Sequence, residues 1–175
     1  MRESVFTKIY PKRTIKRVER KMKLLGDETH SFVILNLRII ISLILFVTIL
    51  LTSSIGYVLA PVVAILFYYV SEKVILDYPI KKRGKKLEKE SLFFFEILLL
   101  TLESGRNLGH ALQLTTQNID SELSSEFKKT LAEVKLGKSL NEALNDMKKR
   151  IPSDTINNAI LNMVESNMFG NNIIE

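Results

Sequence analysis

The sequence IIISLILFVTILLTSS (residues 39–54) is followed directly by IGYVLAPVVAILFYYVS (residues 55–71), and neither stretch contains a charged residue or a histidine. A membrane-spanning helix needs about 20 apolar residues, and a single helix made of the whole run would be much longer than one span. Residues 52–56, TSSIG, offer a break. The pattern predicts a two-helix transmembrane hairpin over residues 32–76. A buried helix pair in a soluble protein is the alternative, but soluble helices rarely run this far without a charge.

Basic residues crowd both flanks of this apolar run. The chain has 25 Lys and Arg residues against 19 Asp and Glu residues, which gives a formal net charge of +6. Short basic segments remain on the cytoplasmic side of a membrane, so the charges place both ends of the hairpin and the region after it in the cytoplasm. They predict a multi-pass protein of the cell (inner) membrane. The flanking residues are Lys8, Lys12, Arg13, Lys16, Arg17, Arg20, Lys21 and Lys23 before the run, and Lys73, Lys81, Lys82, Arg83, Lys85, Lys86 and Lys89 after it.

Two kinds of partner suit such basic segments. Anionic lipid headgroups attract each Lys or Arg near a membrane surface by about 1 kcal/mol, and nucleic acid attracts basic clusters in general. Few aromatic residues lie among these charges, and the clusters border the predicted membrane segments. Membrane lipids are therefore the expected partner, and nucleic acid is not expected.

The sequence divides into four segments. Residues 1–31 form a basic N-terminal arm, either an amphipathic helix or a solvated segment, with apolar residues every three or four positions after Pro11. Residues 32–76 form the hairpin, and residues 77–90, with the run KKRGKK, form a basic connector. Residues 91–175 form a helical domain. The chain contains no cysteine, which excludes disulfides and thiolate metal sites and suits a reducing cytoplasm.

A recurring unit punctuates the last of these segments. It reads GRNLGHAL at residues 105–112, GKSLNEAL at 137–144 and GNNIIE at 170–175. A glycine can close a helix in the left-handed conformation, and the polar residue two positions later can cap the next helix. Ser139 and Glu142 also have the spacing of a capping box. Each unit therefore predicts a tight helix–turn–helix corner. The predicted corner residues are Gly105, Asn107, Gly137, Ser139, Glu142, Gly170 and Asn172.

Apolar residues between the corners recur at helical spacing and predict a buried core. Examples are the stripes Leu108, Ala111, Leu112, Thr115 and Ile119, and Leu123, Phe127, Leu131 and Val134. Residues 92–102, LFFFEILLLTL, are apolar almost all round but too short to span a membrane. They are interpreted as the buried central helix of a bundle. Glu96 and Glu103 lie seven positions apart, near one face of that helix.

The corners resemble the cytoplasmic domain of the type II secretion system F family. Its members are the inner-membrane platform proteins of secretion systems, type IV pili and tight-adherence (Tad) pili. Three stretches carry the resemblance: LLLTLESGRNLGHAL (98–112), LAEVKLGKSLNEALNDMKKRIPS (131–153) and NMVESNMFGNNIIE (162–175). The resembling region runs from about Leu92 to Glu175, about half of the chain. A single domain preceded by a membrane hairpin is most similar to the tight-adherence branch of the family.

The resemblance implies an all-α fold in which the transmembrane hairpin precedes a cytoplasmic antiparallel helical bundle, with five helices and the start of a sixth. It implies a scaffold for pilus or secretion assembly, with three kinds of partner: a hexameric secretion ATPase, pilin subunits, and either a second platform protein or further copies of the same chain. The family's sixth helix and a following membrane span have no counterpart here. The chain is therefore expected to be a truncated gene product or fragment, or to be completed by a partner chain.

Catalytic chemistry is not expected. The sequence has no phosphate-binding loop and no dinucleotide fingerprint, because Gly137-Lys138-Ser139 lacks the upstream glycine. His30 and His110 stand without ligands at metal spacing, so no metal or cofactor is expected. The alternatives to the scaffold are a membrane-tethered helical adaptor for unrelated partners and a transporter subunit. The possible partner contacts are Lys128, Lys129, Lys148 and Lys149.

Overall fold

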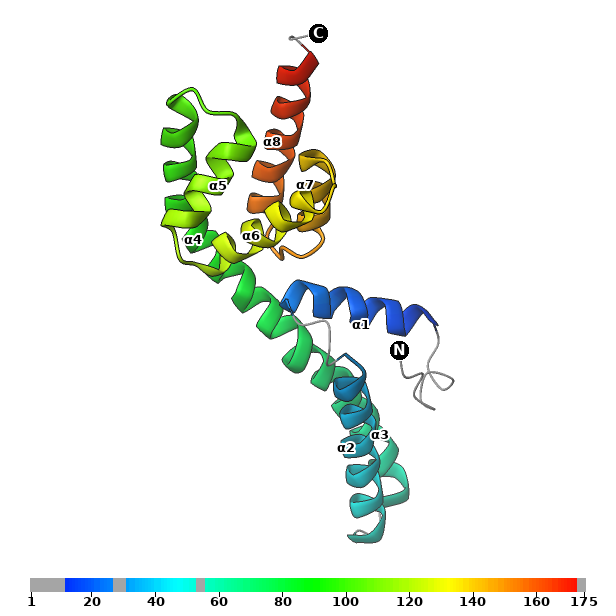
Figure 1. The fold of residues 1–175 in the computed structure, drawn as a ribbon. Coiled ribbons are helices and arrows are strands. Elements are labelled where there is room, and N and C mark those ends of the chain that lie inside the picture. The colour runs from blue at the N-terminus through cyan, green and yellow to red at the C-terminus, as the bar shows by residue number, and fades with distance from the viewer. Residues whose placement is uncertain (1–11, 27–30, 53–55, 173–175) are drawn as a thin grey trace. The chain divides into compact units, whose positions relative to one another are not determined.

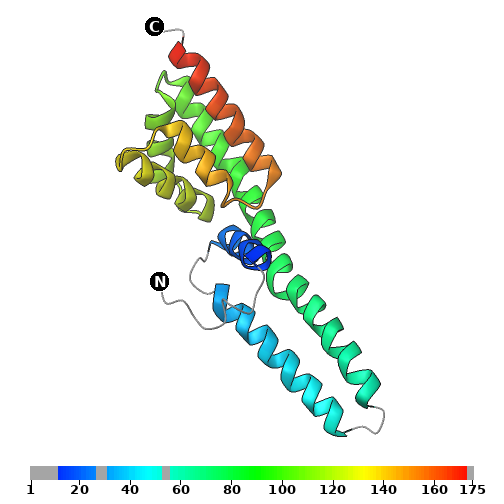
Figure 2. The same cartoon turned by 90° about the vertical axis from the view of Figure 1, so that its right-hand side faces the viewer.

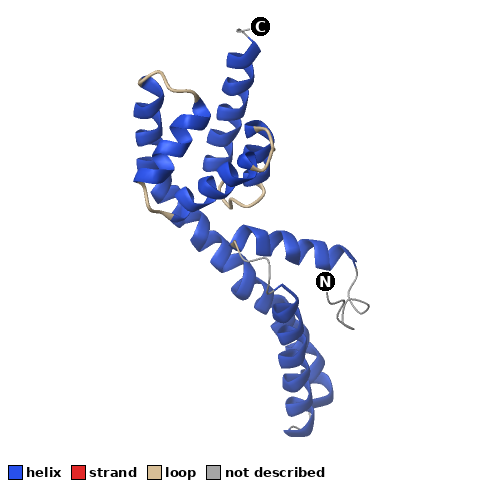
Figure 3. Cartoon of the chain, in the orientation of Figure 1, coloured by secondary structure: helices blue, strands red, loops and turns tan. Residues whose placement is uncertain are grey.

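The computed structural model describes residues 12–26, 31–52 and 56–172. Helices joined by turns and short loops make up this part of the chain, and no strand occurs in it (Figures 1 and 3). The all-α prediction is confirmed for these residues. The chain forms two compact units, Met1–Ile80 and Lys81–Glu175, and each is described by itself.

The first unit contains a helix pair at the place of the predicted hairpin. Helix α2 (Ser31–Thr52) and helix α3 (Gly56–Glu72) pack along each other (Figure 2). The Ser42 hydroxyl donates a hydrogen bond from α2 to the Ala64 carbonyl oxygen of α3, at 3.4 Å. The predicted turn at residues 53–55 lies outside the described residues. In the ranges that the structure describes, no helix combines the length with the apolar composition needed to cross a membrane.

An amphipathic helix, α1 (Lys12–Leu25), packs beside a short π-helical segment, η2 (Lys73–Asp77), that follows α3. Val18 and Met22 of α1 are buried against Leu76. Lys21 Nζ lies 2.7 Å from carboxylate oxygens of both Glu72 and Asp77. From Lys12 onward the basic arm is therefore an amphipathic helix in which Val18 and Met22 of the apolar stripe are buried, and not a solvated segment.

The second unit contains most of α4 (Tyr78–Glu103), followed by α5 (Leu108–Asn118), α6 (Glu122–Lys135), α7 (Leu140–Lys148) and α8 (Asp154–Asn172). Each helix from α5 to α8 packs against its neighbour in the sequence. Their shared core contains a parallel stack of Phe94 on Phe127, with ring centroids 4.6 Å apart. The other fully or almost fully buried apolar residues of this core are Leu87, Leu98, Ala111, Leu112, Ile119, Leu123, Leu144, Met147, Ile151, Ile156, Ile160 and Val164.

The basic connector is helical and partly buried. Residues 78–90 are the first half of α4, and Arg83, Gly84 and Leu87 are buried there. A run of charges usually indicates a solvated linker, but Arg83 has acidic partners in α6, which allow it to be enclosed. Residues 77–90, predicted as a basic connector, thus include the boundary between the two units after Ile80 and are helical from Tyr78 onward.

Two predictions for this unit are wrong. Residues 92–102 are buried on one side only, because Leu92, Phe93, Leu99 and Leu100 are between 57% and 77% exposed. Glu96 and Glu103 are exposed as well. No corner forms at Gly170 and Asn172, because α8 continues through both residues. A glycine inside a helix costs only about 1 kcal/mol, so it does not have to end one. Residues 173–175, the predicted start of a sixth helix, lie outside the described residues.

Candidate functional site

The first corner joins α4 to α5 through a left-handed glycine. Gly105 has φ = +81°, a conformation that favours glycine over residues with a Cβ atom. Its N–H donates to the Leu102 carbonyl oxygen, at 2.9 Å. Asn107 then caps α5, since its side-chain oxygen accepts a 2.9 Å hydrogen bond from the His110 N–H. Asn107 therefore has a structural role at the start of α5.

The second corner joins α6 to α7 in the same way. Gly137 has φ = +103°. The Glu142 N–H donates to Ser139 Oγ at 3.2 Å, and the Ser139 N–H donates back to Glu142 Oε2 at 3.1 Å. This is the reciprocal capping box, which satisfies two backbone donors at the start of α7. The two corners fix the directions of the helices, and the side chains of Asn107, Ser139 and Glu142 are used for hydrogen bonds to the backbone.

The four candidate contact lysines differ in their surroundings. Lys128, Lys129 and Lys149 are exposed, whereas Lys148 is half-buried. Lys129 pairs with Glu126 at 3.2 Å and Lys149 pairs with Asp146 at 2.7 Å. Among the described residues, Lys128 and Lys148 have no ion pair. Any attraction of an acidic partner would therefore depend mainly on Lys128 and Lys148.

A buried charge cluster, which sequence reasoning missed, lies in the second unit where α4 meets α6 and the segment after α7. Glu126 of α6 is only 2% exposed, and Arg83 of α4 is almost as deeply buried. Arg83 Nη2 lies 2.9 Å from Glu126 Oε1, and Arg83 Nε lies 2.6 Å from Glu122 Oε1. Arg150 Nε approaches Glu126 Oε2 to 3.3 Å, while its carbonyl oxygen accepts a hydrogen bond from Arg83 at 2.9 Å. These contacts join α4, α6 and the segment after α7.

The cluster continues toward the surface as a series of alternating charges. Arg150 pairs with Glu133, which also accepts a 2.6 Å hydrogen bond from Lys138. Lys138 pairs in turn with Asp146, and Asp146 with Lys149. Hydrogen bonds from Lys149 and Lys138 lower the pKa of Asp146 from 3.8 to about 2. The hydrogen bond from Lys138 and the charge of Arg150 likewise lower the pKa of Glu133.

One sequence signal for this cluster exists. Glu122, Glu126 and Glu133 are spaced by four and seven residues, so they share one face of α6. Burial raises the pKa of Glu122, but the hydrogen bonds from Arg83 and Lys86 outweigh burial and lower it overall. The sequence does not reveal the basic partners, because Arg83 and Arg150 lie far from α6 along the chain.

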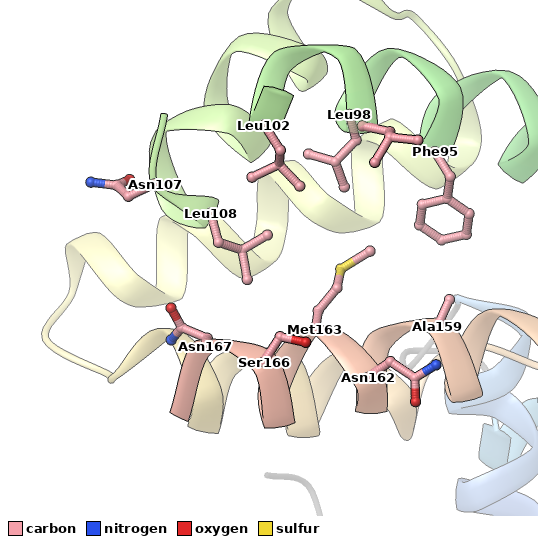
Figure 4. Close-up of a pocket in the computed structure, with 11 residues that line it drawn as sticks. Phe95, Leu98, Leu102, Asn107, Leu108, Ala159, Asn162, Met163, Ser166 and Asn167 are labelled. Carbon is pink, nitrogen blue, oxygen red and sulfur yellow. The ribbon is translucent and has the colours of Figure 1, made fainter. Parts of the chain in front are cut away.

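The second unit also has an apolar groove between α4 and α8, with a volume of about 700 Å³. Figure 4 shows Phe95, Leu98 and Leu102 of α4 facing Ala159 and Met163 of α8 across this groove. No charged side chain lines it. In the described part of the chain, no group of His, Cys, Asp and Glu residues is arranged to hold a metal ion. The groove is therefore suited to an apolar surface and not to a metal or an ionic substrate.

The second unit is thus a helical domain with two capped corners and a buried charge cluster. Its groove and its exposed lysines are surfaces that other molecules can contact. Residues 94–175 of this domain match the family model described as "Type II secretion system (T2SS), protein F". The match supports the family that the three motifs resemble, and it does not distinguish the tight-adherence branch within that family. No curated protein and no solved structure matches the chain.

Proposed function

We propose that this protein is a non-enzymatic platform of the inner membrane that supports assembly of a pilus or a type II secretion apparatus. The match of residues 94–175 to the type II secretion system F family is the observation that carries the proposal. In this role the second unit lies in the cytoplasm and provides surfaces for other components, and the tight-adherence type is the branch that we favour.

The proposal keeps residues 32–76 as a membrane hairpin on the basis of the sequence, since no helix in the described ranges has the length and apolar composition of a span. Residues 39–71 contain no charged residue, and the segments on both sides are basic, as the cytoplasmic ends of membrane helices are. Such a hairpin lacks the ionisable residues that usually mark an ion path within a membrane. An anchor for a scaffold is therefore a better reading of the hairpin than a transporter subunit.

The partners that we propose are a hexameric cytoplasmic ATPase, pilin subunits in the membrane, and a second platform protein or further copies of the same chain. Lys128 and Lys148 are the proposed ATPase contacts, since internal ion pairs already engage Lys129 and Lys149. A basic surface steers an acidic partner and accelerates association. A tethered adaptor for unrelated partners remains the competing function.

Photo-crosslinking in the cell tests the proposal. A photoreactive amino acid replaces Ala132, an exposed residue one helical turn from Lys128, in the full chain, and the captured protein is identified after membranes have been washed with alkaline carbonate. We expect the chain to stay with the membranes and to capture a hexameric secretion ATPase or a second platform protein. Capture of signalling proteins alone would favour the adaptor, and loss of the chain from washed membranes would contradict the membrane hairpin.

A matched pair of variants tests the lysines. Lys128→Glu/Lys148→Glu should abolish ATPase capture, because it reverses the charges that lack an internal partner. Arg106→Glu/Asn158→Glu lowers the net charge by about 3, against about 4 for the first variant, at two other exposed positions and should leave capture within about twofold of the parent, because surface charges away from a contact usually contribute little. Equal capture by both variants would exclude these lysines as the contact.

A further inference from the structure

The outer side of α4 exposes large apolar side chains in the second unit. Leu92 is 77% exposed, and Phe93, Leu99 and Leu100 are each 57–58% exposed. Leu99 also lines the groove between α4 and α8, and at 3.6 residues per turn Leu92 lies beside Leu99 on the same side of α4. The apolar surface of the groove therefore continues onto the exposed side of α4. Soluble domains rarely leave such contiguous apolar surfaces uncovered unless another molecule binds there.

Two carboxylates form the rim of this surface at Leu92 and Leu99, and separate it from Phe93 and Leu100 further around the helix. At 3.6 residues per turn, Glu96 and Glu103 lie about 40–60° around α4 from Leu99, on the side opposite Leu102. Both are exposed, and neither has an ion pair within the described ranges. Seven residues of helix separate them, which is about 10 Å along the axis. The rim therefore carries two uncompensated negative charges at a spacing of two helical turns.

The opposite wall is small and uncharged. Ala159, Asn162 and Ser166 of α8 line the groove, and the last two are exposed. Neither α8 nor residues 92–103 of α4 contain a Lys or Arg residue. In a chain with a net charge of +6, this is an acidic and apolar surface. Small residues on one wall allow the backbone of another helix to approach closely, while leucines on the other wall provide the apolar contact.

We propose that the groove between α4 and α8 binds an amphipathic α-helix of another protein. That helix has apolar residues at spacings of three and four, which fill the space between Leu99, Leu102 and Met163. It also has Lys or Arg residues seven positions apart, which pair with Glu96 and Glu103. We base this on the second unit alone, and it holds whether or not the chain is a secretion platform.

Other occupants fit the surface less well. A second copy that docks through the same face would bring four carboxylates together without a cation. Like charges at an interface oppose association, so this dimer is disfavoured. The basic helix α1 does not suit the groove either, since its Val18 and Met22 are already buried against Leu76. An anionic lipid surface would be repelled by Glu96 and Glu103.

Peptide binding to the full chain tests the proposal. Because the sequence has no cysteine, a fluorophore can be attached at Ser166→Cys alone, with the protein held in phosphatidylcholine nanodiscs and empty nanodiscs as the blank. Two synthetic helices of about 20 residues, long enough to be helical, have leucine at the same heptad positions. One has lysine and the other glutamate at the flanking positions. The lysine peptide should bind at least fivefold more tightly.

Charge reversal distinguishes specific docking from general attraction. In Glu96→Lys/Glu103→Lys the preference should invert, so that the glutamate peptide binds more tightly, while Glu165→Lys on α8, which is exposed and does not line the groove, should retain the original order. Leu99→Asp should weaken binding of the lysine peptide at least tenfold. All these positions are exposed, so circular dichroism should report an unchanged fold.

Several results would overturn the proposal. These are failure of both peptides to bind, equal binding of the two peptides, an unchanged preference after Glu96→Lys/Glu103→Lys, and full binding to Leu99→Asp. A change in the fluorophore signal that depends on protein concentration in the absence of peptide would assign the groove to a second copy of the chain, and would overturn the proposal as well.

Discussion

Gly84 determines how closely α4 can approach the loop before α8. A Cβ atom at this position would lie 2.2 Å from the Pro152 carbonyl oxygen, which is far inside contact distance. Because the obstacle is backbone, it cannot rotate away as a flexible side chain would. The sequence shows Gly84 only as part of a charged run, and nothing in the local pattern indicates a contact with a residue so far along the chain.

Gly84→Ala should therefore destabilise the second unit by about 1–3 kcal/mol, as overpacking of a close contact does. The change would otherwise favour the helix by up to about 1 kcal/mol. Gly109→Ala is the control, because its Cβ atom would lie at an ordinary 3.8 Å from Leu140 and should be neutral or stabilising. Urea unfolding of the full chain measures both free energies. Equal values would show that the loop moves freely away from α4.

The helices after Gly105 were predictable because their determinants are local. Ala111 and Leu112 are buried in α5, and Leu123 and Phe127 are buried in α6, as their spacing predicts. The glycine at Gly137 and the capping box after it depend on residues only a few positions apart. The extent to which α4 is buried was not predictable in the same way. An apolar sequence shows which side chains can be buried, but not on how many sides the helix has neighbours.

The contacts between helices depend on partners that sequence spacing does not reveal. Arg83 reaches Glu122 and the Arg150 carbonyl oxygen, which are 39 and 67 positions away in the chain. Glu126 has Arg83 and Arg150 close to its two carboxylate oxygens. The charge cluster therefore fixes α4 against α6 and the segment after α7, in a region that apolar packing alone would leave less specific.

Removal of the central carboxylate should be strongly destabilising. In Glu126→Leu, Arg83 and Arg150 lose a shared acceptor while they remain largely enclosed, and breaking a buried pair on one side costs about 3 kcal/mol or more. Lys129→Ala removes an ion pair of the same carboxylate, but from a side chain that is 57% exposed, and should cost less than about 1 kcal/mol. Differential scanning calorimetry should rank the two melting temperatures in this order. A similar loss in both variants would contradict the central role of Glu126.

At the scale of the whole molecule, the charge cluster makes stability depend on acid. Glu122, Glu133 and Asp146 all have pKa values below their ordinary ones. The unfolded chain therefore binds protons more readily than the folded one in the range between the two sets of values. The contribution of these carboxylates to the free energy of unfolding is therefore fully present above about pH 5 and is lost as the pH drops toward 2.

Urea titrations followed by circular dichroism at several pH values should show this fall. Asp146→Asn removes the carboxylate whose pKa is near 2, so its free energy of unfolding should be lower at neutral pH and should decline less steeply in acid. Asp120→Asn, at an exposed position without an ion pair in the described part of the chain, should follow the parent curve. A free energy of unfolding that stays constant between about pH 5 and 2.5 would contradict the contribution of these carboxylates.

The division of the chain was only partly predictable. The long uncharged run and the motifs after Gly105 mark two regions of different character, and the structure likewise has two compact units. Their boundary after Ile80 lies within α4, where the helix is continuous. Composition marks a boundary where charges accumulate, whereas a helix can extend through such a run when its partners neutralise it.

The exposed leucines of α4 have a consequence for the life of the protein in a cell. Chaperones and proteases remove copies of a protein in which apolar surface stays accessible. A molecule whose groove is empty displays Leu92, Leu99 and Leu100 continuously, without any unfolding step. The abundance of the protein would then depend on the amount of the partner that covers this surface. Chains made in excess of that partner would be degraded and would not accumulate as free protein.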